Sequence, residues 1–170
     1  MRADTARWHL QERQKVYTDF MRAAVATGAT LSGITNTFEE LDLDSAAEKL
    51  QACRDRTSDL TGACALVLLQ GPREVANKAL TLDDNFSELL NLGKQWKKAI
   101  IADDQEKIES VAPKFRDALE AVNDQGTEFA RSAHAVLVKE ESSLETPETG
   151  ATARPGRLWA AHARRRLRRQ

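Results

Sequence analysis

Apolar and small residues recur in alternating steps of three and four along four stretches of this chain, which is the spacing of helices that pack side by side. Steps of that size place one narrow stripe along each helix, and neighbouring helices must cover the stripe. The stripe positions are Leu10, Tyr17, Phe20, Ala24, Leu31, Ile34, Phe38 and Leu41; Leu43, Ala46, Leu50, Cys53, Thr57, Leu60, Cys64 and Val67; Val75, Ala79, Leu82, Phe86, Leu89, Trp96 and Ile100; and Ile108, Val111, Phe115, Ala118, Val122, Phe129 and Val136. The pattern predicts an all-α chain.

The first stretch predicts a helix from near Asp4 to Leu41. Gly28 and Gly33 lie inside it, and each costs around 1 kcal/mol of helix propensity relative to alanine. Because the stripe keeps its phase across both glycines, we expect packing to hold a single helix together. The alternative is a break at Gly28, with a separate short helix after Thr30.

Ser45 followed by Glu48 is a capping-box pattern, which predicts the start of a second helix that runs to about Gln70. Gly71-Pro72 predicts the next boundary, because glycine suits a left-handed stop after a helix and proline suits the first turn of the following one. A third helix is then expected over residues 72–102. Gly93 lies on its stripe and is a point at which this helix could split.

Asp103 with Glu106 three residues later resembles a second capping box and predicts a fourth helix that reaches about Val138. Pro113 lies inside this helix, where it removes one hydrogen bond, so a kink is expected. Junctions this short force each helix to reverse direction, so we predict an elongated, antiparallel, coiled-coil-like four-helix bundle over residues 1–138. A dimeric coiled coil of helical hairpins would use the same pattern.

The repeat stops after Lys139. Residues 139–156 are rich in Glu, Ser, Thr, Pro and Gly, which predicts a flexible linker. Residues 157–170 form an Arg-rich tail that we expect to be disordered until it meets a partner, because isolated helices of this length are marginal in water. Residues 154–170 contain seven arginines and no acid, whereas residues 1–153 carry 18 basic and 26 acidic side chains. The sequence therefore predicts an acidic bundle with a cationic tail.

The motifs of catalytic and metal sites are missing from the sequence. None of His9, His134 and His162 has a glutamate three residues before it, so the di-iron motif of helical bundles is absent. The sequence also lacks a phosphate-binding loop, a nucleophile elbow and enough Cys and His for zinc. We interpret His134 as a structural or solvated histidine and predict no catalytic, cofactor-binding or metal-ligating residues. The protein is not expected to be an enzyme.

Two cysteines, Cys53 and Cys64, lie on the same predicted helix. At about 1.5 Å of rise per residue they are roughly 16 Å apart, which is too far for a disulfide within one chain. Because both lie on the stripe, we predict buried, reduced thiols. The alternative is a redox bridge between two chains.

No apolar run approaches the roughly 20 residues of a membrane-spanning helix, and the longest is Ala63 to Leu69. The first residues include Arg2, Asp4 and Arg7 rather than the apolar region of a secretory signal. We therefore expect a cytoplasmic protein without a transmembrane segment.

Two segments resemble a set of uncharacterised actinobacterial helical proteins. The first runs from Arg7 to Phe20 and resembles the R-x-x-Y-x-x-F-type first helix of that set, with three residues rather than two between Arg13 and Tyr17. The second runs from Leu66 to Val75 and has an L-x-G-P-x-x-V junction. The resemblance covers about residues 5–138 and excludes the tail. It implies a helical fold and brings no catalytic residue. Members of that set often carry a membrane segment before the first helix, which this sequence lacks.

The leading functional hypothesis is a non-catalytic helical bundle that mediates protein–protein interaction or self-assembly, with an unknown protein or a second copy as partner. The alternative hypothesis is binding of a polyanion, either nucleic acid or an anionic membrane surface, through the Arg-rich tail. The residues that would carry it are Arg157, Arg164, Arg165, Arg166, Arg168 and Arg169.

Overall fold

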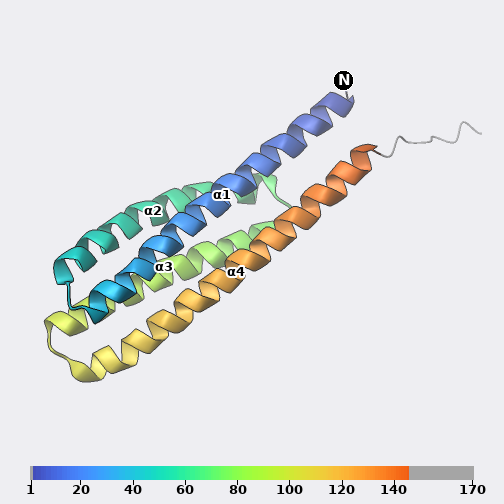
Figure 1. Ribbon diagram of the computed structural model, residues 1–170. Coiled ribbons are helices and arrows are strands. Elements are labelled where there is room, and N and C mark those ends of the chain that lie inside the picture. The colour runs from blue at the N-terminus through green and yellow to red at the C-terminus, as the bar shows by residue number, and fades with distance from the viewer. Residues whose placement is uncertain (1, 146–170) are drawn as a thin grey trace, which may run out of the picture.

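The computed structural model describes residues 2–145, which form four helices joined by short turns. These are α1 (Arg2–Glu39), α2 (Leu43–Gln70), α3 (Arg73–Ile101) and α4 (Gln105–Glu145), and residues 2–145 contain no strand. Consecutive helices run in opposite directions and form an elongated bundle (Figure 1). The predicted all-α fold and its antiparallel four-helix architecture are confirmed.

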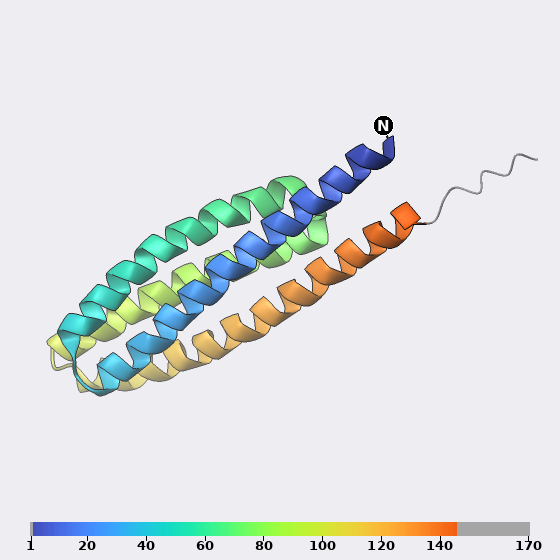
Figure 2. The same ribbon diagram turned by 45° about the horizontal axis from the view of Figure 1, so that its top comes forward.

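The four helices do not form a symmetrical square. Each helix packs against its sequence neighbour, and α1 also packs against α4. Across the diagonals, α1 approaches α3, whereas α2 and α4 do not come close to each other. Figure 2 shows α1 lying between α2 and α4 in the turned view. Both α1 and α3 therefore contact all three other helices, whereas α2 and α4 each contact only two.

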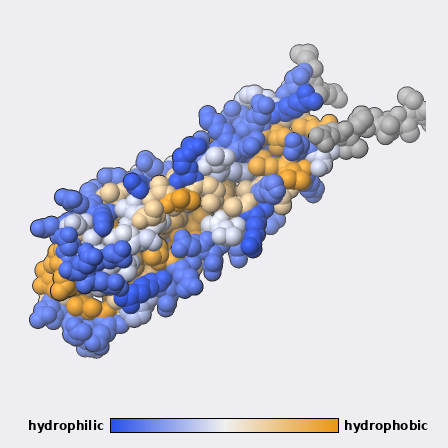
Figure 3. Space-filling view, viewed as in Figure 1, coloured by the Kyte–Doolittle hydropathy of each residue, from blue (hydrophilic) through white to orange (hydrophobic). Residues whose placement is uncertain are grey.

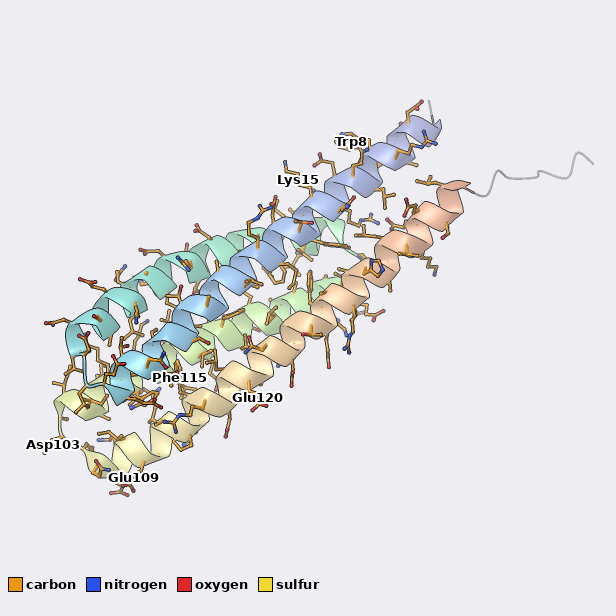
Figure 4. The ribbon with its side chains drawn as sticks, viewed as in Figure 1. Trp8, Lys15, Asp103, Glu109, Phe115 and Glu120 are labelled. Carbon is orange, nitrogen blue, oxygen red and sulfur yellow. The ribbon has the colours of Figure 1, made fainter. Side chains whose placement is uncertain are left out.

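The predicted stripes form the core. Most of their members are buried, and the largest fully buried side chains include Phe20, Phe38, Phe115 and Phe129. The Trp96 ring packs against Phe38 and Phe115 at centroid distances of 4.8 and 5.6 Å, so aromatic contacts join α1, α3 and α4 at the end where α3 turns into α4. Figure 4 shows Phe115 between the helices.

Leu41 is the stripe member that was predicted wrongly, because its side chain is 67% exposed. The first helix ends at Glu39, and Leu41 adopts a left-handed conformation with φ 59° in the turn. Its side chain is therefore carried away from the stripe, since the helical spacing ends before this residue is reached. The turn between α3 and α4 uses Asp103 in the same way, with φ 53°.

The capping residues differ from the predicted ones at both of these turns. Asp42, not Ser45, caps α2, and its carboxylate accepts a hydrogen bond from the Ser45 backbone N–H at 3.1 Å. Asp104 rather than Asp103 accepts the corresponding bond from the Lys107 N–H at 3.1 Å. In both cases the aspartate that follows the left-handed residue is the one that reaches the free N–H groups.

Gly71 marks the predicted boundary, but its conformation is not the predicted left-handed one. It is extended, with φ −85° and ψ 154°, and Pro72 stands just before α3 rather than in its first turn. Glycine is required here by close packing. A Cβ at Gly71 would lie 2.8 Å from the Val67 carbonyl oxygen and 3.1 Å from the Tyr17 hydroxyl.

The helices run without a break through the glycines at which a break was considered, so the single first helix that was expected is confirmed. The alternative break at Gly28 and the split at Gly93 are both wrong, and α4 remains helical on both sides of Pro113. Gly93 instead permits a close approach. A Cβ there would lie 3.0 Å from Leu50 Cδ2 and 3.3 Å from Phe115 Cε2.

The last helix is longer than predicted. It continues to Glu145, so residues 139–145 of the predicted linker are helical and the predicted end at Val138 is wrong. The hydroxyls of Ser142 and Ser143 bond back to carbonyls one turn earlier, and Glu140 pairs with a side chain of α1. The rest of the linker and the Arg-rich tail lie outside the described residues.

Candidate functional site

Two of the helices extend beyond the other two at one end of the bundle. The longer pair, α1 and α4, contain 38 and 41 residues, whereas α2 and α3 contain 28 and 29. All the excess lies at the end where α2 turns into α3, as Figures 1 and 2 show. We call residues 2–16 of α1 and 136–145 of α4 the overhang, because Tyr17 is the residue of α1 that meets Gly71 in the turn.

The overhang lacks the helices that cover the rest of the core. The predicted stripes continue into it through Leu10 and Val136, and both of these side chains are only partly buried. They line a groove of about 670 Å³ that begins above Pro72. The groove is lined by Ala6, His9, Leu10, Arg13, Pro72, Val136, Lys139, Glu140, Ser143 and Leu144. The stripe of α1 thus extends about two turns beyond the turn in which α2 ends and α3 begins.

Exposed apolar side chains gather at the same end of the bundle. Trp8 is 56% and Leu69 is 81% exposed. Leu66 and Leu68 of α2 and Val138 of α4 are exposed as well. Figure 3 shows a hydrophobic area on the overhang and a paler strip that continues between α1 and α4. Figure 4 shows Trp8 and Lys15 on the side of α1 that faces away from α4. An apolar area of this kind on the surface of a helical bundle is typical of an interaction surface.

A polar contact holds the two overhanging helices together at the base of the groove. The Arg13 guanidinium donates a hydrogen bond to the Glu140 carboxylate, and both side chains are partly buried. Arg13 Nε and the Tyr17 hydroxyl are buried next to this pair without a hydrogen-bond partner. Burial raises the pKa of the Tyr17 hydroxyl, which the nearby Arg13 charge only partly opposes. The base of the groove therefore holds one ion pair of opposite charges, with the buried Tyr17 hydroxyl beside it.

Charge is distributed unevenly between the overhang and the body of the bundle. Residues 2–16 and 136–145 together carry five basic and five acidic side chains, so the overhang is neutral. The intervening residues 17–135 carry 13 basic and 20 acidic side chains. The acidic excess predicted for residues 1–153 is therefore confined, within the described chain, to the body.

The α2–α3 hairpin is itself divided by charge. Its half next to the overhang, residues 57–92, contains five acidic and two basic side chains. Its other half, residues 43–56 and 93–101, contains three acidic and six basic ones. The acidic half begins at the base of the overhang, beside the Gly71-Pro72 turn.

Asp83 is a buried acid within that acidic half. It is 8% exposed, and Thr61 Oγ1 donates to its carboxylate at 3.0 Å. Burial raises the pKa of Asp83, and the Asp84 charge raises it further, against the opposing effect of the Thr61 hydrogen bond. Among the ion pairs of the described residues, none involves Asp83, Asp84 or Glu88. These three carboxylates on α3 therefore have no cationic partner in that part of the chain.

A second groove, of about 490 Å³, lies between α1 and α4 in the body. Small residues such as Gly28, Ala29 and Gly126 form its walls, and Leu82 and Phe86 of α3 form its floor. Val25 lies at its edge and is 65% exposed. Its lining contains no ionisable side chain, and its polar side chains are those of Ser32, Asn123 and Thr127.

The structure gives little support to chemistry at the histidines and cysteines. His9 and His134 are exposed, and the described residues contain no group of three or more His, Cys, Asp or Glu side chains arranged for a metal ion. Cys53 and Cys64 are unpaired and buried, as predicted, and burial raises the pKa of Cys64 to about 11. Such a thiol is almost wholly protonated near neutral pH and is a poor nucleophile.

The predicted polyanion-binding arginines, Arg157, Arg164, Arg165, Arg166, Arg168 and Arg169, all lie outside the described residues. Sequence reasoning missed the overhang, because the predicted fourth helix ended at Val138. The available signal was the spacing of Val136, Glu140 and Leu144, which keeps steps of four beyond the last stripe residue.

Comparisons with protein-family models, with curated proteins and with solved structures find no match for this chain. The resemblance to actinobacterial helical proteins therefore stays a prediction. None of the described helices combines the length and the apolar composition needed to cross a bilayer.

Proposed function

We propose that this protein is a non-catalytic helical bundle that self-associates, with two copies meeting end to end through their overhangs. The observation that carries the proposal is the open stripe at Leu10 and Val136, which lies where α2 and α3 no longer cover α1 and α4. Apolar stripe positions on a helix gain stability when neighbouring helices cover them. The overhang of a second copy would supply the two missing helices.

A two-fold axis perpendicular to the long axis of the bundle would cover the open stripes of both copies at once. The overhang of each copy would fill the groove of the other, and its tip would come to rest near the other copy's Gly71-Pro72 turn. The result would be a second, short four-helix bundle between the two bodies. Such a contact is isologous, because the same surface serves on both sides, and two-fold dimers are the commonest symmetric assembly.

The distribution of charge favours a contact through the overhang over a contact along the sides of the bundle. Two copies that met side by side would bring together bodies that each carry an excess of acidic side chains. Two overhangs that meet bring together surfaces with equal numbers of acidic and basic groups. We therefore favour the end-to-end contact over a lateral one.

Sedimentation velocity of the full-length protein over a range of concentrations tests the proposal. The expected result is a reversible monomer–dimer equilibrium, with the dimer elongated rather than compact. Leu10→Glu or Val136→Glu should shift it to monomer, because each change buries an unpaired carboxylate in the contact. Circular dichroism of each variant should show unchanged helix content.

Val25→Glu is the matched control, since it places the same charge on an exposed apolar residue beside the second α1–α4 groove. It should leave the dimer intact. Loss of the dimer with Val25→Glu, but not with Leu10→Glu, would move the contact to the second groove. A monomer at every concentration would mean that the overhang does not bind a second copy.

Polyanion binding through the Arg-rich tail stays a prediction, because those residues lie outside the described chain.

A further inference from the structure

The end of α4 directs the chain toward a particular surface in the proposed dimer. Within one copy α3 lies beside α4 and begins at the base of the overhang (Figure 1). The two-fold arrangement would place the tip of α4 in one copy against the start of α3 in its partner, so the two helices would follow one another nearly in line. The residues after Glu145 would therefore continue along the partner's α3.

That stretch of α3 is the acidic half of the hairpin. Asp84 and Glu88 are exposed and Asp83 lies beside them, and no ion pair of the described residues involves any of the three. The chain that follows Glu145 carries seven arginines between residues 154 and 170. An acidic surface without counter-charges and a cationic segment are complementary.

We propose that the Arg-rich segment of each copy binds the acidic half of the partner's α2–α3 hairpin. The inference rests on the self-association proposed above, and it assigns the tail a partner: a second copy of this chain. Its arginines would supply the cations that the carboxylates around Asp84 and Glu88 lack. The tail would then act as a charged clamp on a contact whose centre is apolar.

The lengths of the two segments are compatible. Along the partner's α3, Asp84 would lie roughly 18 Å and Glu88 roughly 24 Å from the Pro72 turn, at 1.5 Å per residue. Residues 146–153 span up to about 26 Å when extended, so Arg154 can reach this surface and the later arginines can pass along it.

The tail is also long enough to fold back on its own copy, so the experiment must separate binding within a chain from binding between chains. Three full-length variants serve this purpose. The tail variant carries Glu in place of the five arginines at Arg164, Arg165, Arg166, Arg168 and Arg169, which changes the side-chain charge of residues 154–170 from +7 to −3. The acceptor variant carries Asp84→Lys and Glu88→Lys. The control carries Glu120→Lys and Asp124→Lys, the same charge change on exposed residues of α4.

The dimer dissociation constant of each variant is measured by sedimentation at one ionic strength. The tail and acceptor variants should each weaken the dimer by roughly tenfold or more, since several ion pairs become repulsive. An equimolar mixture of the two should restore dimers near the wild-type level. Only in the mixed dimer does each reversed segment meet a surface of opposite charge on the other copy. The control should change the dissociation constant little, alone or in mixtures.

Each alternative gives a different pattern. If mixing restores nothing, but a single chain with both sets of changes behaves like wild type, the tail binds within its own copy and the proposal is wrong. If the wild type dimerises and neither variant weakens it, the tail is not part of the contact, while the overhang contact stands. If the wild type is monomeric, the proposed function and this inference both fail.

Discussion

Arg13 on α1 and Glu140 on α4 form an ion pair between the two helices that form the overhang. The two residues are 127 positions apart in sequence, and their side chains are 25% and 36% exposed. The pair lies at the base of the groove, so it fixes the spacing of the two helices where α2 and α3 no longer do so.

Replacing Arg13 by Met, Glu140 by Gln, and both together should give a coupling free energy of at most about 1 kcal/mol, because partly exposed ion pairs are weak. Global stability measured by urea unfolding should therefore change little. Amide exchange within residues 2–16 should accelerate more than exchange at the core of α2. Equal acceleration in both regions would show that the pair stabilises the whole bundle rather than the overhang.

Tyr17 and Gly71 should respond in opposite directions to substitution. Tyr17→Phe removes a buried hydroxyl that has no hydrogen-bond partner, so stability should be unchanged or rise by up to about 1 kcal/mol. Gly71→Ala should lower stability by roughly 1–3 kcal/mol, because its Cβ would meet the Val67 carbonyl oxygen at 2.8 Å.

The double variant tests whether the Tyr17 hydroxyl contributes to that cost. Since the added Cβ would also lie 3.1 Å from the hydroxyl oxygen, Gly71→Ala should cost less in the Tyr17→Phe background. The same cost in both backgrounds would assign the strain to the Val67 carbonyl alone.

Two glycines inside helices provide a matched comparison. Gly93 is buried, and an added Cβ would lie 3.0 Å from Leu50 and 3.3 Å from Phe115, so Gly93→Ala should destabilise the protein by roughly 1–3 kcal/mol. Gly62 has nothing within 4 Å of the position of an added Cβ, so Gly62→Ala should stabilise it by about 0.5–1 kcal/mol through helix propensity. Thermal unfolding of both variants measures the difference. Stabilisation by Gly93→Ala would mean that Leu50 on α2 and Phe115 on α4 can move away from the added Cβ without a loss of stability.

The sequence predicted the helices, their order and most of the core, because a stripe with steps of three and four is fixed by helix geometry alone. The details that depend on contacts between distant residues were not predictable. Gly71 was assigned a left-handed conformation, whereas the close approach of Tyr17 is what requires glycine there. The overhang was missed for the same reason. The Arg13–Glu140 pair that ties α4 to α1 joins residues at opposite ends of the bundle sequence.

Asp83 should make stability depend on pH in the direction opposite to that of most carboxylates. Burial raises its pKa above the ordinary value of 3.8, so the folded state binds this proton more tightly than the unfolded state does. The stabilising contribution of the protonated acid is complete below about pH 3.8 and is lost as the pH rises through the raised pKa of the folded state.

Asp83→Asn removes this titration and keeps a carbonyl oxygen that can accept the hydrogen bond from Thr61 Oγ1. The variant should be more stable than wild type at pH 7, and its advantage should shrink as the pH falls toward 4. Urea unfolding at several pH values measures the two curves. Glu88→Gln is the control, because it removes an exposed carboxylate from the same helix and should leave the slope of stability with pH nearly unchanged. An advantage of Asp83→Asn that stayed constant down to pH 4 would show that the asparagine gains a new contact, and that ionisation of Asp83 is not what costs stability.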